Sequence, residues 1–128
     1  MIAGALLLLA AAPGLNCADR DRADQSTLNM CAYRDFQRAD AALNAEWSRV
    51  VADVKQRDRD LDRSYDRQPG WFDTLLAGQR AWLTWRDRQC ELESFQARGG
   101  SMQPMLASGC KAALTEARTT QLKSLIEE

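Results

Sequence analysis

The chain has 128 residues, enough for one domain with a modest hydrophobic core but not for two. Its 17 basic and 18 acidic residues are interspersed and give a formal net charge of −1, which is typical of a solvated surface and excludes the basic footprint of a nucleic-acid-binding protein. Histidine is absent, which excludes histidine general bases, nucleophile activation by histidine and histidine metal ligands. We therefore predict a protein that is not an enzyme, with no catalytic residue and no cofactor.

The first fifteen residues, MIAGALLLLAAAPGL, carry no charged side chain. The apolar run 2–12 has the length of a signal-peptide core and is too short to span a membrane. The Pro-Gly that follows suits a cleavage site, although the usual Lys or Arg near Met1 is missing. We predict a signal peptide over 1–15, in preference to a buried N-terminal helix, and one folded domain over 16–128 that is periplasmic or secreted and has no membrane span.

Apolar residues recur at helical spacing from Leu28 to Leu61, after the good N-cap residues Ser26 and Thr27. This pattern predicts one long amphipathic helix. The sequence Gln-Pro-Gly at 68–70 then ends it.

A second helix is predicted over about 71–97, and the glycines at 99–100 end it. Either Ser101 or Gln103 caps a third helix, which carries Pro104 in its first turn. No alternating strand pattern occurs in the sequence. The predicted fold class is therefore all-α, an antiparallel three-helix bundle with two disulfides and short connections.

The four cysteines, Cys17, Cys31, Cys90 and Cys110, form an even set, which is typical of two disulfides in an exported chain. None of them stand two to four residues apart, as ligands of structural zinc do, so we predict no metal site. Cys90 and Cys110 both lie about 14 Å from the turn between the second and third helices, and should face each other. The segment that carries Cys17 can fold back on Cys31. We therefore predict the pairs Cys17–Cys31 and Cys90–Cys110.

Arg86 falls in the middle of the apolar arc of the second helix. A buried guanidinium needs a polar partner. Asp40 lies in or beside the apolar arc of the first helix, at the same height of about 18 Å above the base of the bundle. We predict that Asp40 and Arg86 pair, with Asn44 and Gln79 extending a polar network that fixes the helix register. A catalytic role is the less favoured interpretation, because neither partner has a nucleophile or general base beside it.

Two other features have a structural and a functional interpretation. Trp47, Trp82 and Trp85 stand at helical spacing, so packing of the core is favoured over a sugar-stacking platform. Trp85 and Trp71 lie toward the edges of the apolar face and are the ones that could be exposed. The acids within 58–62 could mimic the paired carboxylates of a glycosidase. Because they alternate with arginine, a solvated helix end is the favoured interpretation.

Several segments form an ordered series that covers nearly the whole folded domain. They are Cys31, ADAALNAEW (39–47), QRAWLTWRDRQCE (79–91), GGSMQPM (99–105) and CKAALTEARTTQL (110–122). Together they resemble the lysozyme inhibitor LprI-like N-terminal domain, a family of small exported bacterial helical proteins. The family takes its name from a mycobacterial surface lipoprotein that inhibits animal-type lysozymes. Membership implies the helical fold, and it implies lysozyme as a partner.

The resemblance assigns no inhibitory residue. The matching polar positions are Asp40, Asn44, Gln79, Arg80, Arg86, Asp87, Glu91, Thr115 and Arg118. Asn16, before Cys17, does not suit a lipid-attachment sequence, so the resemblance to a lipoprotein does not extend to surface anchoring. A soluble periplasmic or secreted form is the favoured one.

We predict an exported, non-enzymatic protein-binding module whose partner is lysozyme or another envelope protein. The alternative is an envelope protein that binds a small ligand or cell-wall component in a helical groove, and a peptidoglycan-acting enzyme ranks third because histidine is absent. The candidate binding loop consists of Arg98, Gly99, Gly100, Ser101 and Met102. It combines a basic group with an apolar anchor, which suits a cleft that holds two carboxylates, although its glycines equally suit a plain turn between helices. The opposite tip, with Tyr65, Arg67 and Trp71, competes with it.

Overall fold

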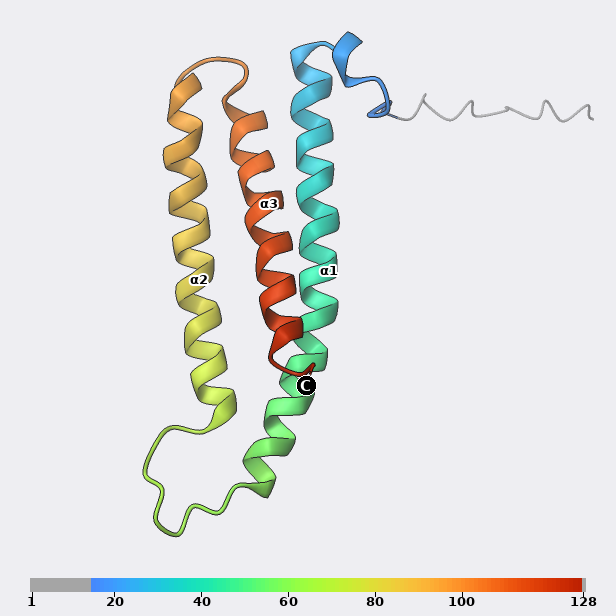
Figure 1. The fold of residues 1–128 in the computed structure, drawn as a ribbon. Coiled ribbons are helices and arrows are strands. Elements are labelled where there is room, and N and C mark those ends of the chain that lie inside the picture. The colour runs from blue at the N-terminus through green and yellow to red at the C-terminus, as the bar shows by residue number, and fades with distance from the viewer. Residues whose placement is uncertain (1–14, 128) are drawn as a thin grey trace, which may run out of the picture.

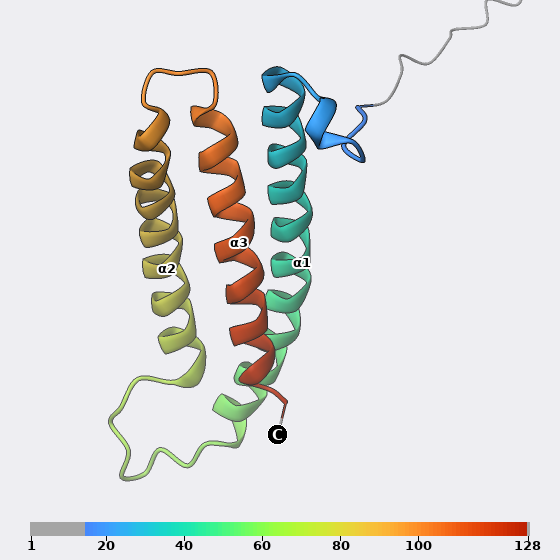
Figure 2. The ribbon, with the colours of Figure 1, turned by 45° about the horizontal axis from the view of Figure 1, so that its top comes forward.

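The computed structural model describes residues 15–127, which form three long helices (Figure 1). The elements are η1 (Arg20–Arg22), α1 (Gln25–Asp60), α2 (Trp71–Ser94), η2 (Phe95–Ala97) and α3 (Gln103–Ser124), where η denotes a short 3-10 turn. Helices α1 and α3 run in one direction and α2 runs in the other (Figures 1 and 2). The predicted all-α, three-helix fold is confirmed. Of its two connections, the one between α2 and α3 is short, whereas the one between α1 and α2 occupies residues 61–70.

The predicted signal peptide, 1–15, lies outside the described residues except for its last position, and it stays a prediction. Among the helices of residues 15–127, none combines the length and the apolar character that crossing a membrane requires.

The start of α1 differs from the predicted one by a few residues. Asp24 is the N-cap, and its Oδ1 accepts a hydrogen bond from the backbone N–H of Thr27 at 2.7 Å. This backbone hydrogen bond is the main cause that lowers the pKa of the Asp24 carboxyl. Ser26 and Thr27, the predicted caps, lie inside the first turn, because the carboxylate of Asp24, just before the helix, already accepts from one of the free N–H groups.

The first turn of α2 is capped from the end of α1. Its own N-cap residue, Gly70, makes no side-chain cap. Instead, the carboxylate of Asp58 accepts hydrogen bonds from the backbone N–H groups of Trp71 at 2.7 Å and Phe72 at 3.0 Å. A Cβ at Gly70 would lie 2.9 Å from an Asp58 oxygen, so a larger residue there would push the carboxylate from its present position. Asp58, predicted to be solvated, ties α1 to α2 across the connection 61–70.

The apolar core occupies the part of the bundle between the middle of α1 and the connection 61–70. Its buried members are Leu43, Val50, Val54 and Leu122, against which Trp47, Phe72, Leu75, Trp82 and Ile126 pack. Trp47 and Trp82 therefore belong to the core, as predicted. Trp85 is 51% exposed and lies outside it. Burial of this cluster on α1 and α3 stabilises their contact through the hydrophobic effect.

Both predicted disulfides are confirmed and lie in the other part of the bundle. Cys17 bonds to Cys31 with a Cα–Cα distance of 5.6 Å, and Cys90 bonds to Cys110 with a Cα–Cα distance of 5.4 Å. They close sequence separations of 14 and 20 residues, and a loop of this size contributes about 3 kcal/mol in the chain-entropy model. The second bond also fixes the register of α2 against α3.

Replacing Asp58 with alanine should lower the melting temperature at pH 7, because two N–H groups of α2 lose their acceptor. The hydrogen bond from Phe72 is the main cause that lowers the pKa of Asp58 in the folded state. The contribution of Asp58 is therefore present above the unfolded pKa of about 3.9 and is lost as the pH falls through the lower folded pKa. Thermal melts of wild type and Asp58→Ala should differ at pH 7, and the difference should begin to shrink below about pH 4 and vanish only below the folded pKa of Asp58.

Asp60→Ala is the matched control for this experiment. Asp60 is exposed two residues further on, and its Oδ1 accepts a hydrogen bond from Gln56 within α1. Its replacement should change the melting temperature little. If Asp58→Ala has the same melting temperature as wild type at pH 7, the proposed capping of α2 by Asp58 is wrong.

Candidate functional site

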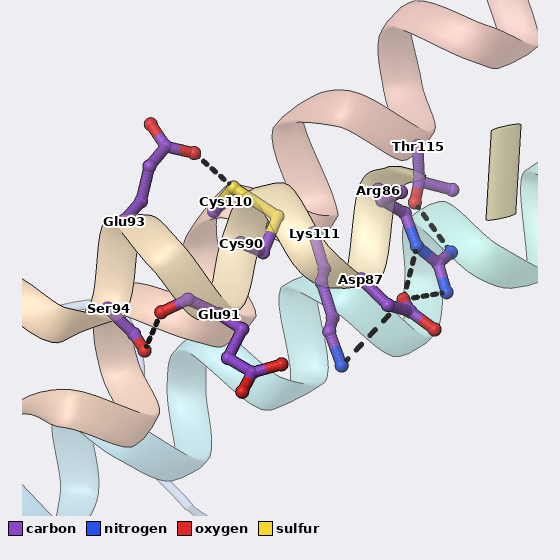
Figure 3. Close-up of a disulfide and its surroundings, with 9 residues drawn as sticks. All are labelled: Arg86, Asp87, Cys90, Glu91, Glu93, Ser94, Cys110, Lys111 and Thr115. Carbon is purple, nitrogen blue, oxygen red and sulfur yellow. Dashed lines mark hydrogen bonds and ion pairs between the residues drawn. A yellow bond between two sulfur atoms is a disulfide. The ribbon is translucent and has the colours of Figure 1, made fainter. Parts of the chain in front are cut away.

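Arg86 is buried inside the bundle, as predicted, but its partner is not Asp40. Its Nε and Nη2 donate to Asp87 Oδ1 at 3.0 and 2.9 Å, and its Nη1 donates to Thr115 Oγ1 of α3 at 3.2 Å (Figure 3). The predicted Asp40–Arg86 pair is therefore wrong. The physical reason is the length of the arginine side chain, which lets the guanidinium reach back to the neighbouring carboxylate of its own helix.

The other predicted members of the network are separate from Arg86. Asn44 Nδ2 donates to Asp40 Oδ2 at 3.5 Å, within α1. Gln79 is buried, and its Oε1 accepts a hydrogen bond from Arg118 Nε of α3 at 2.9 Å. The residues predicted to form one network thus belong to three separate groups. Asp40 and Asn44 are joined by a long hydrogen bond on the surface of α1, Arg86 makes its own contacts, and Gln79 connects α2 to α3 through Arg118.

Aromatic rings complete the surroundings of Arg86. Its guanidinium carbon lies 5.1 Å from the centroid of Phe36 and 5.3 Å from that of Trp82. Lys111 Nζ lies 5.7 Å from the Phe36 centroid, and the Arg118 guanidinium lies 5.9 Å from the Trp82 centroid. Three cations therefore alternate with two rings, whose faces attract positive charge. The sequence did not predict this cation–aromatic row, although the spacing of Trp82 and Arg86 by four residues is a signal for their contact.

Arg86, Asp87, Thr115, Phe36 and Trp82 form what we call the Arg86 centre. This centre is closed to large ligands. Arg86 is 6% exposed and Thr115 is fully buried, so the hydroxyl that accepts the guanidinium N–H does not face solvent. The Arg86 side chain, on α2, contacts Phe36 of α1 and Thr115 of α3, so it connects all three helices. These contacts support a structural role.

The disulfide beside this centre does not offer a metal site. Cys90, Cys110 and Glu93 bring ligand-type atoms within 4.8 Å of one another (Figure 3). Both sulfurs belong to the disulfide, however, and a metal needs a thiolate.

The predicted binding loop joins α2 to α3, and all five of its residues, 98–102, are exposed. Met102 is the N-cap of α3, rather than the predicted Ser101 or Gln103, and it makes no side-chain cap. Gly99 has φ of 78°, in the left-handed region that favours glycine. A side chain at this position would strain the turn.

Hydrogen bonds hold the loop from both sides. The N–H of Gly99 donates to Gln103 Oε1 at 3.0 Å, and Gln103 Nε2 donates to Ser94 Oγ at 3.3 Å. The carbonyl of Ser101 accepts a hydrogen bond from Asn29 Nδ2 of α1 at 2.9 Å. The glycines therefore provide a sharp turn whose position is fixed, and not a freely flexing segment.

A cavity of about 530 Å³ lies beside this loop, between α2 and α3. Asp87, Glu91 and Lys111 contribute charged groups to its wall, and the glycines 99–100 lie at its end. Lys111 Nζ is 4.0 Å from Asp87 Oδ1 (Figure 3). The cavity thus offers charges of both signs to polar groups of a partner.

Comparison with known proteins gives these features a family. Residues 17–122 match the sequence profile of the family described as lysozyme inhibitor LprI. The chain belongs to the LprI family. The match includes all four cysteines, the Arg86 centre and the loop 98–102. It therefore covers both structural halves of this LprI protein.

Two relatives extend the comparison. Uncharacterized protein R02472 of Rhizobium meliloti (strain 1021) is 47% identical over 108 residues, which are 84% of this chain and 78% of the relative. Uncharacterized protein YecT of Escherichia coli (strain K12) is 27% identical over 107 residues, which are 80% of this chain and 65% of that protein. This chain thus spans slightly less than two thirds of YecT. No solved structure matches the chain.

Asp87→Ala should destabilise the protein by about 2 kcal/mol, because it leaves the buried Arg86 guanidinium without a carboxylate. Arg86→Met should cost less, since it removes the buried charge and keeps a long apolar side chain against the rings. In the Asp87→Ala background, Arg86→Met should restore about 1 kcal/mol. Urea denaturation of the three variants measures these differences. If Arg86→Met proves the more costly single substitution, the buried charge itself stabilises the fold.

Proposed function

We propose that this LprI protein is an exported protein-binding module that inhibits a lysozyme with the loop between α2 and α3. Membership of the LprI family supports the activity and its partner. Two disulfides are typical of proteins that fold in an oxidising compartment, which supports a periplasmic or secreted location. The proposal assigns no catalytic step to the chain.

The exposed Arg98 and Met102 on a fixed loop carry this proposal. The Arg98 guanidinium lies 4.5 Å from the centroid of Phe95, which holds the charge at the surface, and Met102 is 40% exposed. A lysozyme cleft contains two catalytic carboxylates, with which an arginine can form charge-assisted hydrogen bonds. Met102 supplies the apolar anchor that a binding centre needs.

A fixed loop favours tight binding, because little conformational entropy is lost when the complex forms. The loop is held by Asn29 of α1 and by the α2–α3 disulfide two to three turns below it. The segment before α1 is held at the same end of the bundle (Figure 1). Cys17–Cys31 anchors it covalently, and Arg20 donates to both oxygens of Asp35 at 2.8 and 3.0 Å.

Further apolar side chains are exposed near this end. Met30 and Tyr33, in the first turns of α1, are 50% and 46% exposed. Met30 directly follows Asn29, whose side chain donates a hydrogen bond to the loop, and Tyr33 lies one turn after Asn29. A partner that covers the loop therefore has additional apolar area within reach, as specific interfaces require.

Lysozyme-catalysed lysis of bacterial cell walls tests the proposal. The oxidised protein should inhibit lysis at micromolar concentration, and Arg98→Ala or Met102→Ala should each weaken inhibition by about tenfold or more, as expected for residues at the centre of an interface. Arg67→Ala is the matched control, since Arg67 is also exposed but lies in the opposite connection. Circular dichroism checks the fold of every variant.

Two outcomes would contradict the proposal in different ways. A wild-type protein that does not inhibit would exclude the lysozyme activity. Inhibition that survives both loop substitutions and is lost in Arg67→Ala would move the contact to the opposite connection.

A further inference from the structure

A second cavity, of about 580 Å³, opens at the other end of the bundle. We call it the basal groove. It lies where the end of α1, the start of α2 and the end of α3 approach the connection 61–70, and its principal lining residues are Leu61, Trp71, Leu75, Gly78, Arg118 and Leu125. The volume falls in the range of small-molecule sites.

The walls of the basal groove are mainly apolar, and part of this surface is open to solvent. Trp71 and Leu125 are 46% and 47% exposed. Burial of such side chains by a ligand is favourable in proportion to the apolar area removed from water. The exposed side chains thus favour a ligand with an apolar body.

Arg118 places a positive charge in this apolar wall. Its Nε and Nη1 donate to Gln79 Oε1 at 2.9 Å and to Gln121 Oε1 at 3.2 Å, and both of these acceptors are neutral. Within residues 15–127 Arg118 forms no ion pair, and its Nη2 donates no hydrogen bond to another side chain or carbonyl. Asp66, the carboxylate among the lining residues, accepts instead from the backbone N–H of Gln68 at 2.9 Å.

Arg118 is partly removed from water. Burial lowers the pKa of Arg118, whereas the carboxylate of Asp35 raises the pKa of Arg20 through its hydrogen bonds. A guanidinium remains protonated in either setting. Arg118 is therefore a partly desolvated cation with an open donor, which an anion would stabilise.

Gly78 lies in the wall of the basal groove. It lies inside α2, where glycine destabilises a helix relative to alanine. A Cβ at Gly78 would meet nothing within 4 Å, so no contact in the folded chain requires glycine there. The missing side chain instead keeps the wall of the basal groove open.

We propose that the basal groove binds a small amphiphile that carries one carboxylate or phosphate on an aliphatic body. The anionic group pairs with the open donor of Arg118. The aliphatic body lies along Trp71, Leu75 and Leu125 and passes over Gly78. This binding is separate from the proposed inhibition of lysozyme, which uses the opposite end of the bundle.

Isothermal titration of the oxidised protein with dodecanoate and with dodecyl phosphate, both below their micelle concentrations, tests the proposal. At least one of them should bind, and the tighter one identifies the headgroup. Dodecanol and dodecyltrimethylammonium are controls for the charge and should bind about tenfold more weakly or not at all. Arg118→Gln should abolish this preference. Arg88→Gln, which changes an exposed arginine paired with Glu91 outside the groove, should leave the preference intact.

A pair of glycine substitutions locates the site. Gly78→Leu should fill the groove and weaken binding of the anionic probe by about tenfold or more. Gly109 is the matched control, since it lies inside α3 and a Cβ there also meets nothing within 4 Å. Both variants should melt at or above the wild-type temperature, because leucine favours a helix over glycine. Only Gly78→Leu should lose binding.

Three results would overturn the proposal. One is no binding of either anionic probe. Another is that the neutral and cationic probes bind as tightly as the anionic ones, which would exclude recognition of the negative charge. The last is binding that survives both Arg118→Gln and Gly78→Leu. None of these results bears on lysozyme inhibition, because the loop 98–102 remains unaltered.

Discussion

One guanidinium connects the three helices of this protein. Arg86 projects from α2, lies against Phe36 of α1 and donates to Thr115 of α3. Such a buried charge is tolerated because Asp87 and two aromatic rings replace the water that it loses. The arrangement fixes the relative height of the helices, and the α2–α3 disulfide one turn away keeps the same register. The positions of the loop 98–102 and of the cavity beside it follow from this register.

Helical periodicity and distances along helices made part of the fold predictable. The pair Cys90–Cys110 followed from heights that depend only on the rise of a helix, and the pair Cys17–Cys31 followed from the segment that can fold back on the start of the first helix. The burial of Arg86 followed from its angular position. The partner of Arg86 could not be predicted in this way, because periodicity locates only the Cβ atom. The guanidinium lies at the end of a flexible side chain and donates a hydrogen bond to Asp87, the next residue.

The candidate sites were less predictable than the fold. The loop 98–102 could be chosen from its residue types, but its fixation by Asn29 depends on a contact between residues far apart in sequence. The basal groove depends on how the connection 61–70 carries the chain from α1 to α2. Two signals for it were nevertheless present, a glycine inside a helix at Gly78 and an arginine, Arg118, with no acidic residue three or four positions away.

Covalent and apolar links occupy different halves of the bundle. Val50 of α1 and Leu122 of α3 belong to one buried cluster that involves no sulfur. Hydrophobic collapse of that half is fast compared with disulfide formation. Phe72, Leu75 and Trp82 of α2 pack against the same cluster. This collapse can therefore align α2 with α3 before any thiol is oxidised, so that Cys90 and Cys110 already face each other when they are oxidised. The chain would then reach its native pairing by oxidation alone, with little need for a disulfide isomerase to correct mispaired intermediates.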